Sequence, residues 1–93
     1  MTPRTDEITV HGRVQGISLR WMIEQKAREL GLVGYVRNTD DGGVLIVCRG
    51  TDVHVKKLCD WLSAHPGSSH IDSLIHKHGN ESRRYNQFTI RYP

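Results

Sequence analysis

Apolar residues change their spacing several times along this chain of 93 residues, and each change marks an expected element of structure. Alternating apolar positions predict a first strand that runs through Ile8 and Val10 to Val14. Helical spacing follows, on a face formed by Leu19, Met22, Ile23, Ala27 and Leu30. We expect Ser18 to be the N-cap of this helix and Gly31 its C′ residue.

Strand character returns over residues 32–38. The turn residues Asp40, Asp41, Gly42 and Gly43 come next, and they predict a hairpin whose returning strand covers residues 44–48. Gly50 ends that strand. The pair of carboxylates is therefore interpreted as turn chemistry and not as a catalytic pair.

A second helix is expected after Thr51 or Asp52, either of which can cap it, and Pro66-Gly67 breaks it. Its apolar face holds Val55, Leu58, Cys59 and Leu62. Residues 71–75 then read as a strand and residues 79–86 as a polar loop. The alternation of Phe88, Ile90 and Tyr92 predicts a terminal strand.

The resulting order, βαββαβ with a further short strand, predicts a ferredoxin-like α+β sandwich. We expect a largely antiparallel sheet of four to five strands with two helices on one face. Residues 1–93 are expected to form a single domain, in which the polar residues 1–6 are a flexible N-terminal tail.

Composition narrows the possible surroundings and partners. No run approaches the roughly 18 apolar residues of a membrane span, and the polar start lacks the apolar core of a signal peptide. We therefore expect a cytoplasmic protein without a membrane partner. Thirteen basic and ten acidic residues give a net charge of +3, which suits small anions, but the cations are scattered and predict no nucleic-acid partner.

The segment from Gly12 to Arg20 joins the first strand to the first helix and carries the strongest chemical signal. The first backbone N–H groups of a helix lack intrahelical acceptors and lie at the positive end of the helix dipole, so they favour an anion. Arg20 can close over that anion with its five-donor guanidinium. The segment is a candidate cradle for a phosphate or a carboxylate.

Asn38 closes the expected second strand and is the second candidate. Its amide can both accept and donate hydrogen bonds, so it can orient a water molecule near the Arg20 loop. The alternative interpretation is that Asn38 and Thr39 only shape the hairpin turn. The residue types alone leave both interpretations open.

Three spaced blocks of the sequence resemble the acylphosphatase family. They read Gly12-x-Val14-Gln15-Gly16-Ile17-x-x-Arg20, Gly31-Leu32-x-Gly34-x-Val36-x-Asn38 and Asp41-Gly42-x-Val44. The resemblance continues through Trp61-Leu62, Ser69-His70-Ile71-Asp72 and the ending Phe88 to Tyr92. It therefore covers the chain from about residue 8 onward.

This resemblance implies an enzyme that hydrolyses the carboxyl-phosphate bond of acyl phosphates to a carboxylate and inorganic phosphate, as a monomer and with no metal or organic cofactor. It implies that Asn38 holds and orients the attacking water. The phosphate would be bound by Arg20 and by the backbone N–H groups of Gln15, Gly16, Ile17, Ser18 and Leu19. Such a site fits phosphoryl transfer, which depends on positioning and charge stabilisation more than on a covalent partner.

One position inside the signature departs from the family, whose members commonly have a small residue followed by Phe-Arg. This chain reads Ser18-Leu19-Arg20. Leucine keeps an apolar group but loses the ring and its packing volume, so we expect Leu19 to loosen the cradle and lower activity. Arg20 and Asn38 are intact, and a working enzyme is expected.

Two other functions fit the same fold, because fold alone does not decide function. One is a non-catalytic anion- or RNA-binding module. RNA recognition uses stacking aromatic residues on the central strands, where the early pair of strands offers only Tyr35. The other is an acylphosphatase-like domain of a larger carbamoyl-transfer protein.

The remaining chemistry-bearing residues receive structural interpretations. His76 and His78 share a strand face, with His70 nearby, but the sequence places no third ligand, so no functional metal site is expected. His11 is interpreted as an ordinary strand residue, although it flanks the loop and acid–base work is open to it. Cys48 and Cys59 have no metal spacing and are expected to be buried small apolar residues.

Overall fold

The elements of the fold were taken from a computed structural model, which describes residues 5–15, 17–64, 66–67, 69–79 and 84–92. In chain order they are β1 (Thr5–Arg13), α1 (Ile17–Glu29), β2 (Val33–Asn38), β3 (Val44–Arg49), α2 (Asp52–Ser63), β4 (His70–His78) and β5 (Phe88–Ile90). Among these residues, no helix is both long enough and apolar enough to cross a membrane.

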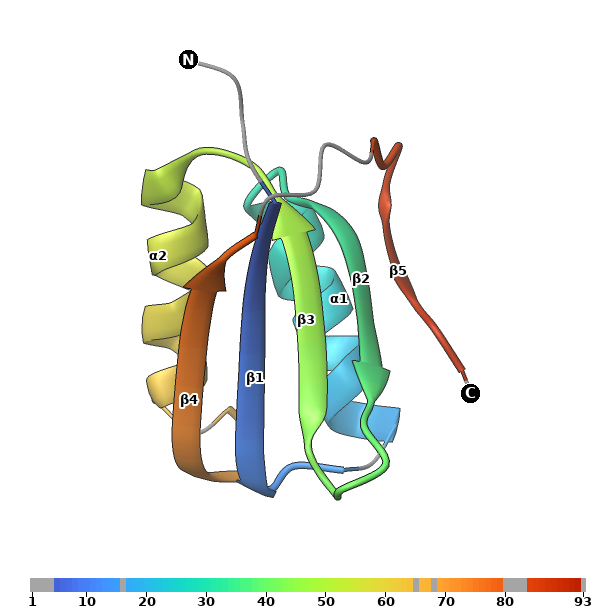
Figure 1. Ribbon diagram of the computed structural model, residues 1–93, viewed down its shortest axis with the longest axis vertical. Helices are drawn as coiled ribbons and strands as arrows, with labels where there is room; N and C mark the ends of the chain where they lie inside the picture. The colour runs from blue at the N-terminus through green and yellow to red at the C-terminus, as the bar shows by residue number, and fades with distance from the viewer. Residues whose placement is uncertain (1–4, 16, 65, 68, 80–83, 93) are drawn as a thin grey trace.

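The described strands form one five-stranded sheet in the order β4-β1-β3-β2-β5. β1 pairs antiparallel with β3 and β4, and β2 pairs antiparallel with β3, whereas β5 lies parallel to β2. Both helices cover the same face of the sheet (Figure 1). The predicted ferredoxin-like α+β fold is confirmed, with the parallel β5 making the sheet mixed.

The core lies between this sheet face and the two helices. Cross-strand pairing puts Ile8, Ile46 and Val36 in one row, and all three are fully buried. Burial of such side chains contributes about 1.5–3 kcal/mol each. The buried apolar set is completed by Val10, Val14, Leu19, Ile23, Ala27, Leu32, Val44, Cys48, Val55, Leu58, Leu62 and Phe88. The helical faces predicted from spacing are thus the faces that pack.

The ends of α1 show one correct and one wrong prediction. The helix begins at Ile17, so Ser18 lies within its first turn and is not the N-cap. At the other end Gly31 has φ +73°, as expected of a C′ residue. Its N–H donates to Arg28 O at 3.0 Å, and Leu32 N–H donates to Ala27 O at 2.9 Å, which satisfies two carbonyls of the last turn.

α2 begins after Thr51, whose hydroxyl accepts from the backbone N–H of His54 at 3.4 Å. Thr51, one of the two predicted candidates, is therefore the N-cap. On the expected apolar face Val55, Leu58 and Leu62 are buried, while Cys59 packs partly buried against the core.

Two strands extend beyond their predicted bounds because pairing defines them more than hydrophobicity does. β1 begins at Thr5, so Thr5 and Asp6, expected in a flexible tail, are strand residues and only 1% exposed. The first four residues of that tail lie outside the described residues. β4 covers residues 70–78 instead of 71–75, because it pairs with β1 from Arg13 to Asp6 while most of its side chains remain exposed.

The terminal strand is shorter than its alternation predicted. β5 covers only Phe88–Ile90, and Tyr92 lies beyond its end, 62% exposed. Of the predicted polar loop 79–86, the described residues 79 and 84–86 belong to no helix or strand, and residues 80–83 lie outside the described part.

Candidate active site

The end of β1, the start of α1 and the turn between β2 and β3 lie at the same end of the sheet (Figure 1). The candidate residues belong to these segments. The pairing of β1 with β4 shifts register between His11 and Gly12. Gly12 has φ +134°, and a Cβ there would collide with the carbonyl oxygen of His70. Only glycine allows this close approach of the two strands, and the chain then passes into the loop before α1.

The start of α1 has the electrostatic character expected of an anion site. Its first turn, Ile-Ser-Leu-Arg at residues 17–20, carries no acidic side chain that would occupy the free N–H groups. Those groups and the helix dipole favour a bound anion. Gly16, which the sequence placed in the cradle, lies outside the described residues, and the side chain of Ser18 is exposed.

Arg20 projects from this turn and is only 7% exposed. Its Nε and Nη1 are buried and find no hydrogen-bond acceptor among the described residues. The Arg20 Cζ atom lies 5.0 Å from the centroid of the Tyr92 ring, but this contact gives the two nitrogens no hydrogen-bond acceptor. A buried cation without an acceptor is costly, and a bound anion would remove that cost.

Asn38 lies at the same end of the sheet, at the last position of β2. It pairs with Val44 of β3, which in turn pairs with Val10 of β1. The Asn38 Oδ1 atom is buried and has no hydrogen-bond partner in the part of the chain that the structure describes. This amide oxygen can therefore accept a hydrogen bond from a ligand or from water.

The C-terminal segment connects the surroundings of Arg20 and Asn38. β5 runs parallel to β2 with Ile90 opposite Val36, and Arg91 N–H extends the ladder by donating to Val36 O at 2.8 Å. Tyr92 and Asn38 each follow two residues after that pair. The Tyr92 ring contacts the Arg20 guanidinium. Because β5 pairs with β2, this contact indicates that Arg20 lies near the end of β2 that holds Asn38.

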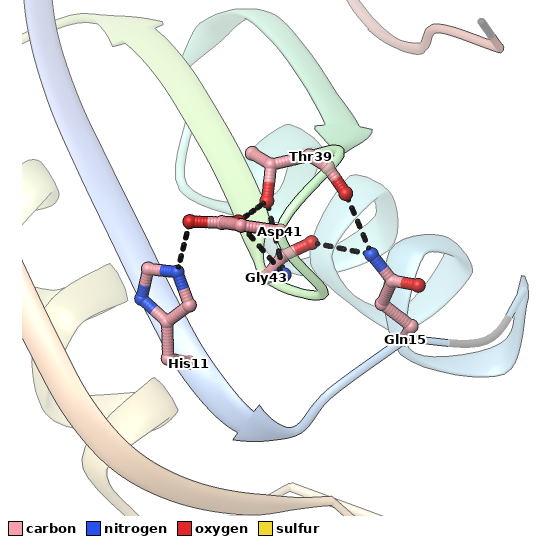
Figure 2. A network of polar contacts seen from close by, with 5 residues as sticks. All are labelled: His11, Gln15, Thr39, Asp41 and Gly43. Carbon is pink, nitrogen blue, oxygen red and sulfur yellow. Dashed lines mark hydrogen bonds and ion pairs between the residues drawn. The ribbon is translucent and has the colours of Figure 1, made fainter.

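Gln15 directly joins the loop to the hairpin. Its Nε2 donates to the carbonyl oxygens of Thr39, at 2.9 Å, and Gly43, at 3.1 Å (Figure 2). The side chain is thereby committed to the turn after Asn38, so any contact of Gln15 with a phosphate would come from its backbone. The sequence held no local signal for this contact, since the partners are 24 and 28 positions away.

The turn itself is held by Asp41. Its carboxylate accepts hydrogen bonds from the Thr39 hydroxyl and from Gly43 N–H, and its Oδ2 lies 3.0 Å from His11 Nε2 (Figure 2). The hydrogen bonds from Thr39 and His11 lower the pKa of Asp41 to about 2. Asp41 therefore has the turn role predicted for it, and His11 is a strand residue that pairs with it.

Leu19 belongs to the core, at 5% exposure, so only its backbone can contribute to an anion cradle. A hollow of about 80 Å³ lies beside it. The hollow is lined by Arg13, Val14, Gln15, Ser18, Leu19, Met22, Pro66 and Ser69. Neither Arg20 nor Asn38 lines this hollow, although Gln15, Ser18 and Leu19 of the expected cradle do.

The cysteines offer no nucleophile here. Burial raises the pKa of Cys48 to about 12, and it also raises the pKa of the partly buried Cys59. Both thiols stay protonated at neutral pH, and a neutral thiol is a poor nucleophile. The predicted burial is confirmed for Cys48 and partial for Cys59.

Together, the fold and these residues define a small α+β protein with a candidate anion site at a helix N-terminus, beside an arginine and an amide. The family model for acylphosphatase matches residues 6–90. The acylphosphatase of Pasteurella multocida is 34% identical over 86 residues, covering 92% of this chain and 96% of that protein. The acylphosphatase of Actinobacillus succinogenes is 36% identical over 84 residues, covering 90% of this chain and 93% of that one.

The crystal structure of acylphosphatase from Bacillus subtilis has the same fold, with a TM-score of 0.88 at 26% identity over 95% of this chain and 98% of that one. The chain therefore belongs to the acylphosphatase family. Acylphosphatases are enzymes of the acid-anhydride hydrolase class.

Proposed function

We propose that this protein hydrolyses the carboxyl-phosphate bond of a small-molecule acyl phosphate and releases a carboxylate and inorganic phosphate. One observation carries the proposal most directly. Buried polar atoms of Arg20 and Asn38 lack partners among the described residues, and both side chains belong to one end of the sheet. Buried polar atoms are almost always hydrogen-bonded, so such a pair favours a bound ligand and a water molecule as the missing partners.

The phosphoryl group is bound by Arg20 together with the backbone N–H groups of residues 15–20. Two guanidinium nitrogens can donate in parallel to two phosphoryl oxygens, a geometry that a lysine could not supply. The backbone donors at the start of α1 point at the same anion and need no rearrangement as charge develops. The side chains of Gln15 and Leu19 act indirectly, through the hairpin and the core.

Asn38 orients the attacking water through its unpartnered amide oxygen. The water oxygen forms a bond to phosphorus while the bond from phosphorus to the acyl oxygen breaks. The electron pair of the broken bond stays on the acyl oxygen, which leaves as the carboxylate. Both protons of the water end on the phosphate product. An amide cannot remove a proton at neutral pH, but the carboxylate is a good leaving group, so positioning can supply most of the rate enhancement.

We further propose that residues 1–93 work as one acylphosphatase-like domain, a cytoplasmic monomer that uses no nucleic-acid or membrane partner. The support is that every proposed site residue comes from this one chain. The reaction as proposed requires only Arg20, Asn38 and backbone groups, so no metal or organic cofactor takes part in it.

Acetyl phosphate hydrolysis by the purified protein tests the proposal. The protein should turn over acetyl phosphate in the presence of EDTA, with inorganic phosphate as a competitive inhibitor. Phosphate binding without turnover would instead identify a non-catalytic anion-binding module. Binding of single-stranded RNA without turnover would identify the RNA-binding alternative.

A further inference from the structure

Three metal-ligating side chains converge at the opposite end of the sheet from the loop before α1. Asp6 Oδ1 lies 2.6 Å from His78 Nδ1 and 3.5 Å from His76 Nε2. One ligand atom from each residue lies within 4.8 Å of the other two. The sequence pointed to His76 and His78 as a pair, and the structure adds Asp6 from the segment expected to be a tail.

The pairing of β1 with β4 explains this convergence. Asp6 is directly opposite His78, and Ile8 is opposite His76. Since side chains two residues apart lie on one face of a strand, Asp6, His76 and His78 share the face that packs against the helices. The two imidazole rings lie 5.1 Å apart, edge to face, with both rings near a single carboxylate oxygen.

The cluster is open on one side. The Asp6 side chain is 1% exposed, whereas those of His76 and His78 are 30% and 58% exposed. The two histidines line a hollow of about 330 Å³ together with Asp52, Val55, Lys56 and Cys59 of α2. An ion can therefore reach the buried carboxylate from solvent, and a water molecule can complete its coordination from the hollow.

We propose that Asp6, His76 and His78 form a binding site for a divalent transition-metal ion, of which Zn²⁺ is the best fit. Two imidazole nitrogens and one carboxylate oxygen are ligands that zinc prefers, whereas Mg²⁺ and Ca²⁺ prefer oxygen alone. Zinc–ligand bonds of about 2.0–2.2 Å in a tetrahedron place ligand atoms roughly 3.3–3.5 Å apart. The distance of 3.5 Å between Asp6 Oδ1 and His76 Nε2 already fits. The distance of 2.6 Å between Asp6 Oδ1 and His78 Nδ1 is too short, and rotation of the half-exposed His78 ring would lengthen it.

The position of the site predicts a structural effect. The bound ion would crosslink the first residues of β1 to the end of β4, which is an edge strand. Arg13 is the residue at the loop end of β1, and Asp6 lies seven residues before it. At roughly 3.3 Å per residue, the two are about 23 Å apart along the strand. Bound zinc should therefore raise the melting temperature and leave acetyl phosphate hydrolysis unchanged, so this inference stands or falls independently of the proposed function.

The test is a calorimetric titration of EDTA-treated, desalted protein with ZnCl₂ and separately with MgCl₂, followed by melting curves. The wild type should bind one Zn²⁺ per chain and have a higher melting temperature with it, and it should not bind Mg²⁺. His76→Gln and His78→Gln should each weaken Zn²⁺ binding by about tenfold or more. His70→Gln is the matched control, because His70 lies on the same strand and pairs with one aspartate, Asp72, at 3.1 Å.

Three results would overturn the proposal. They are no Zn²⁺ binding by the wild type, equal binding by the wild type and both glutamine variants, and loss of binding in His70→Gln. If His78→Gln lowers the melting temperature of metal-free protein and zinc does not raise the melting temperature of the wild type, the cluster is an ion pair only. Asp6→Asn should also lose zinc, but the partly exposed histidines give the cleaner variants because Asp6 is buried.

Discussion

The Gln15 carboxamide donates a hydrogen bond to the carbonyl oxygen of Thr39, at 2.9 Å, and thereby joins the loop before α1 to the hairpin that follows Asn38 (Figure 2). A second bond from the same nitrogen reaches Gly43 O at 3.1 Å. The two proposed halves of the site, phosphate cradle and water holder, are thus connected by one side chain.

Removing this connection should lower both the stability of the fold and the rate of hydrolysis. Gln15→Ala loses two hydrogen bonds worth about 0.5–1.5 kcal/mol each. The freed hairpin lets Asn38 shift, and we expect kcat to fall about 10- to 100-fold. Steady-state kinetics and urea unfolding measure the two effects. Gln25→Ala, at an exposed position of α1, is the control, and equal kcat in both variants would show that the connection is irrelevant to catalysis.

The Asp41 carboxylate predicts a pH dependence of stability. Hydrogen bonds from Thr39 and His11 lower its pKa from 3.8 to about 2. A lowered pKa means that the ionised form stabilises the fold at every pH above about 4, and that this contribution disappears as pH falls toward 2. Asp41→Asn should therefore melt below the wild type at pH 5–7, with the difference shrinking between pH 4 and 2. Asp40→Asn, the exposed neighbour, is the control, and a gap that persists at pH 2 contradicts the prediction.

The burial of Leu19 gives a prediction about stability, beside the lower activity that its departure from the family suggests. Because Leu19 is buried and borders a hollow of about 80 Å³, Leu19→Phe has room for its ring and should preserve or raise stability. Leu19→Ala enlarges the hollow and should cost about 2–5 kcal/mol. Chemical denaturation measures both. Strong destabilisation of Leu19→Phe would show that the hollow cannot accept the ring and that the core is overpacked.

The ring of Tyr92 should support Arg20 through the cation–π contact at 5.0 Å. Such contacts contribute about 0.5–1 kcal/mol at exposed sites, so Tyr92→Leu should weaken phosphate binding about two- to fivefold. Tyr92→Phe keeps the ring and should bind phosphate as the wild type does. Inhibition constants for phosphate measure the effect, and equal weakening in the two variants would assign it to the hydroxyl group instead.

Local patterns predicted the elements whose cause is local. Gly31 ends α1 through its positive φ, and the turn residues before Val44 form the expected hairpin. Arg20 and Asn38 could be named because the family resemblance fixes their spacing. The resemblance did not predict which residues contact Arg20 and Asn38, such as the Tyr92 ring that lies against Arg20.

Contacts between distant positions could not be predicted in this way. Asp6 and His78 are 72 positions apart, and a polar Thr-Asp pair near the chain start has no hydrophobic signal for a buried strand. Only the pairing of β1 with β4 puts the two together. The prediction of Ser18 as an N-cap was also wrong, because α1 begins at Ile17, two residues before the start at Leu19 that an N-cap at Ser18 implies.

The most direct measurement is a comparison of kcat and phosphate inhibition for Arg20→Ala and Asn38→Ala. The controls are Arg28→Ala, an arginine at the far end of α1 that donates to Phe88 O at 3.0 Å, and Asn86→Ala at an exposed position. Arg20→Ala should lose phosphate inhibition and at least about 10³-fold in kcat/KM. Asn38→Ala should lose about 10²–10³-fold in kcat while phosphate still inhibits as in the wild type. Wild-type turnover in Asn38→Ala, or undiminished phosphate inhibition in Arg20→Ala, would contradict a site in which arginine holds the phosphate and asparagine the water.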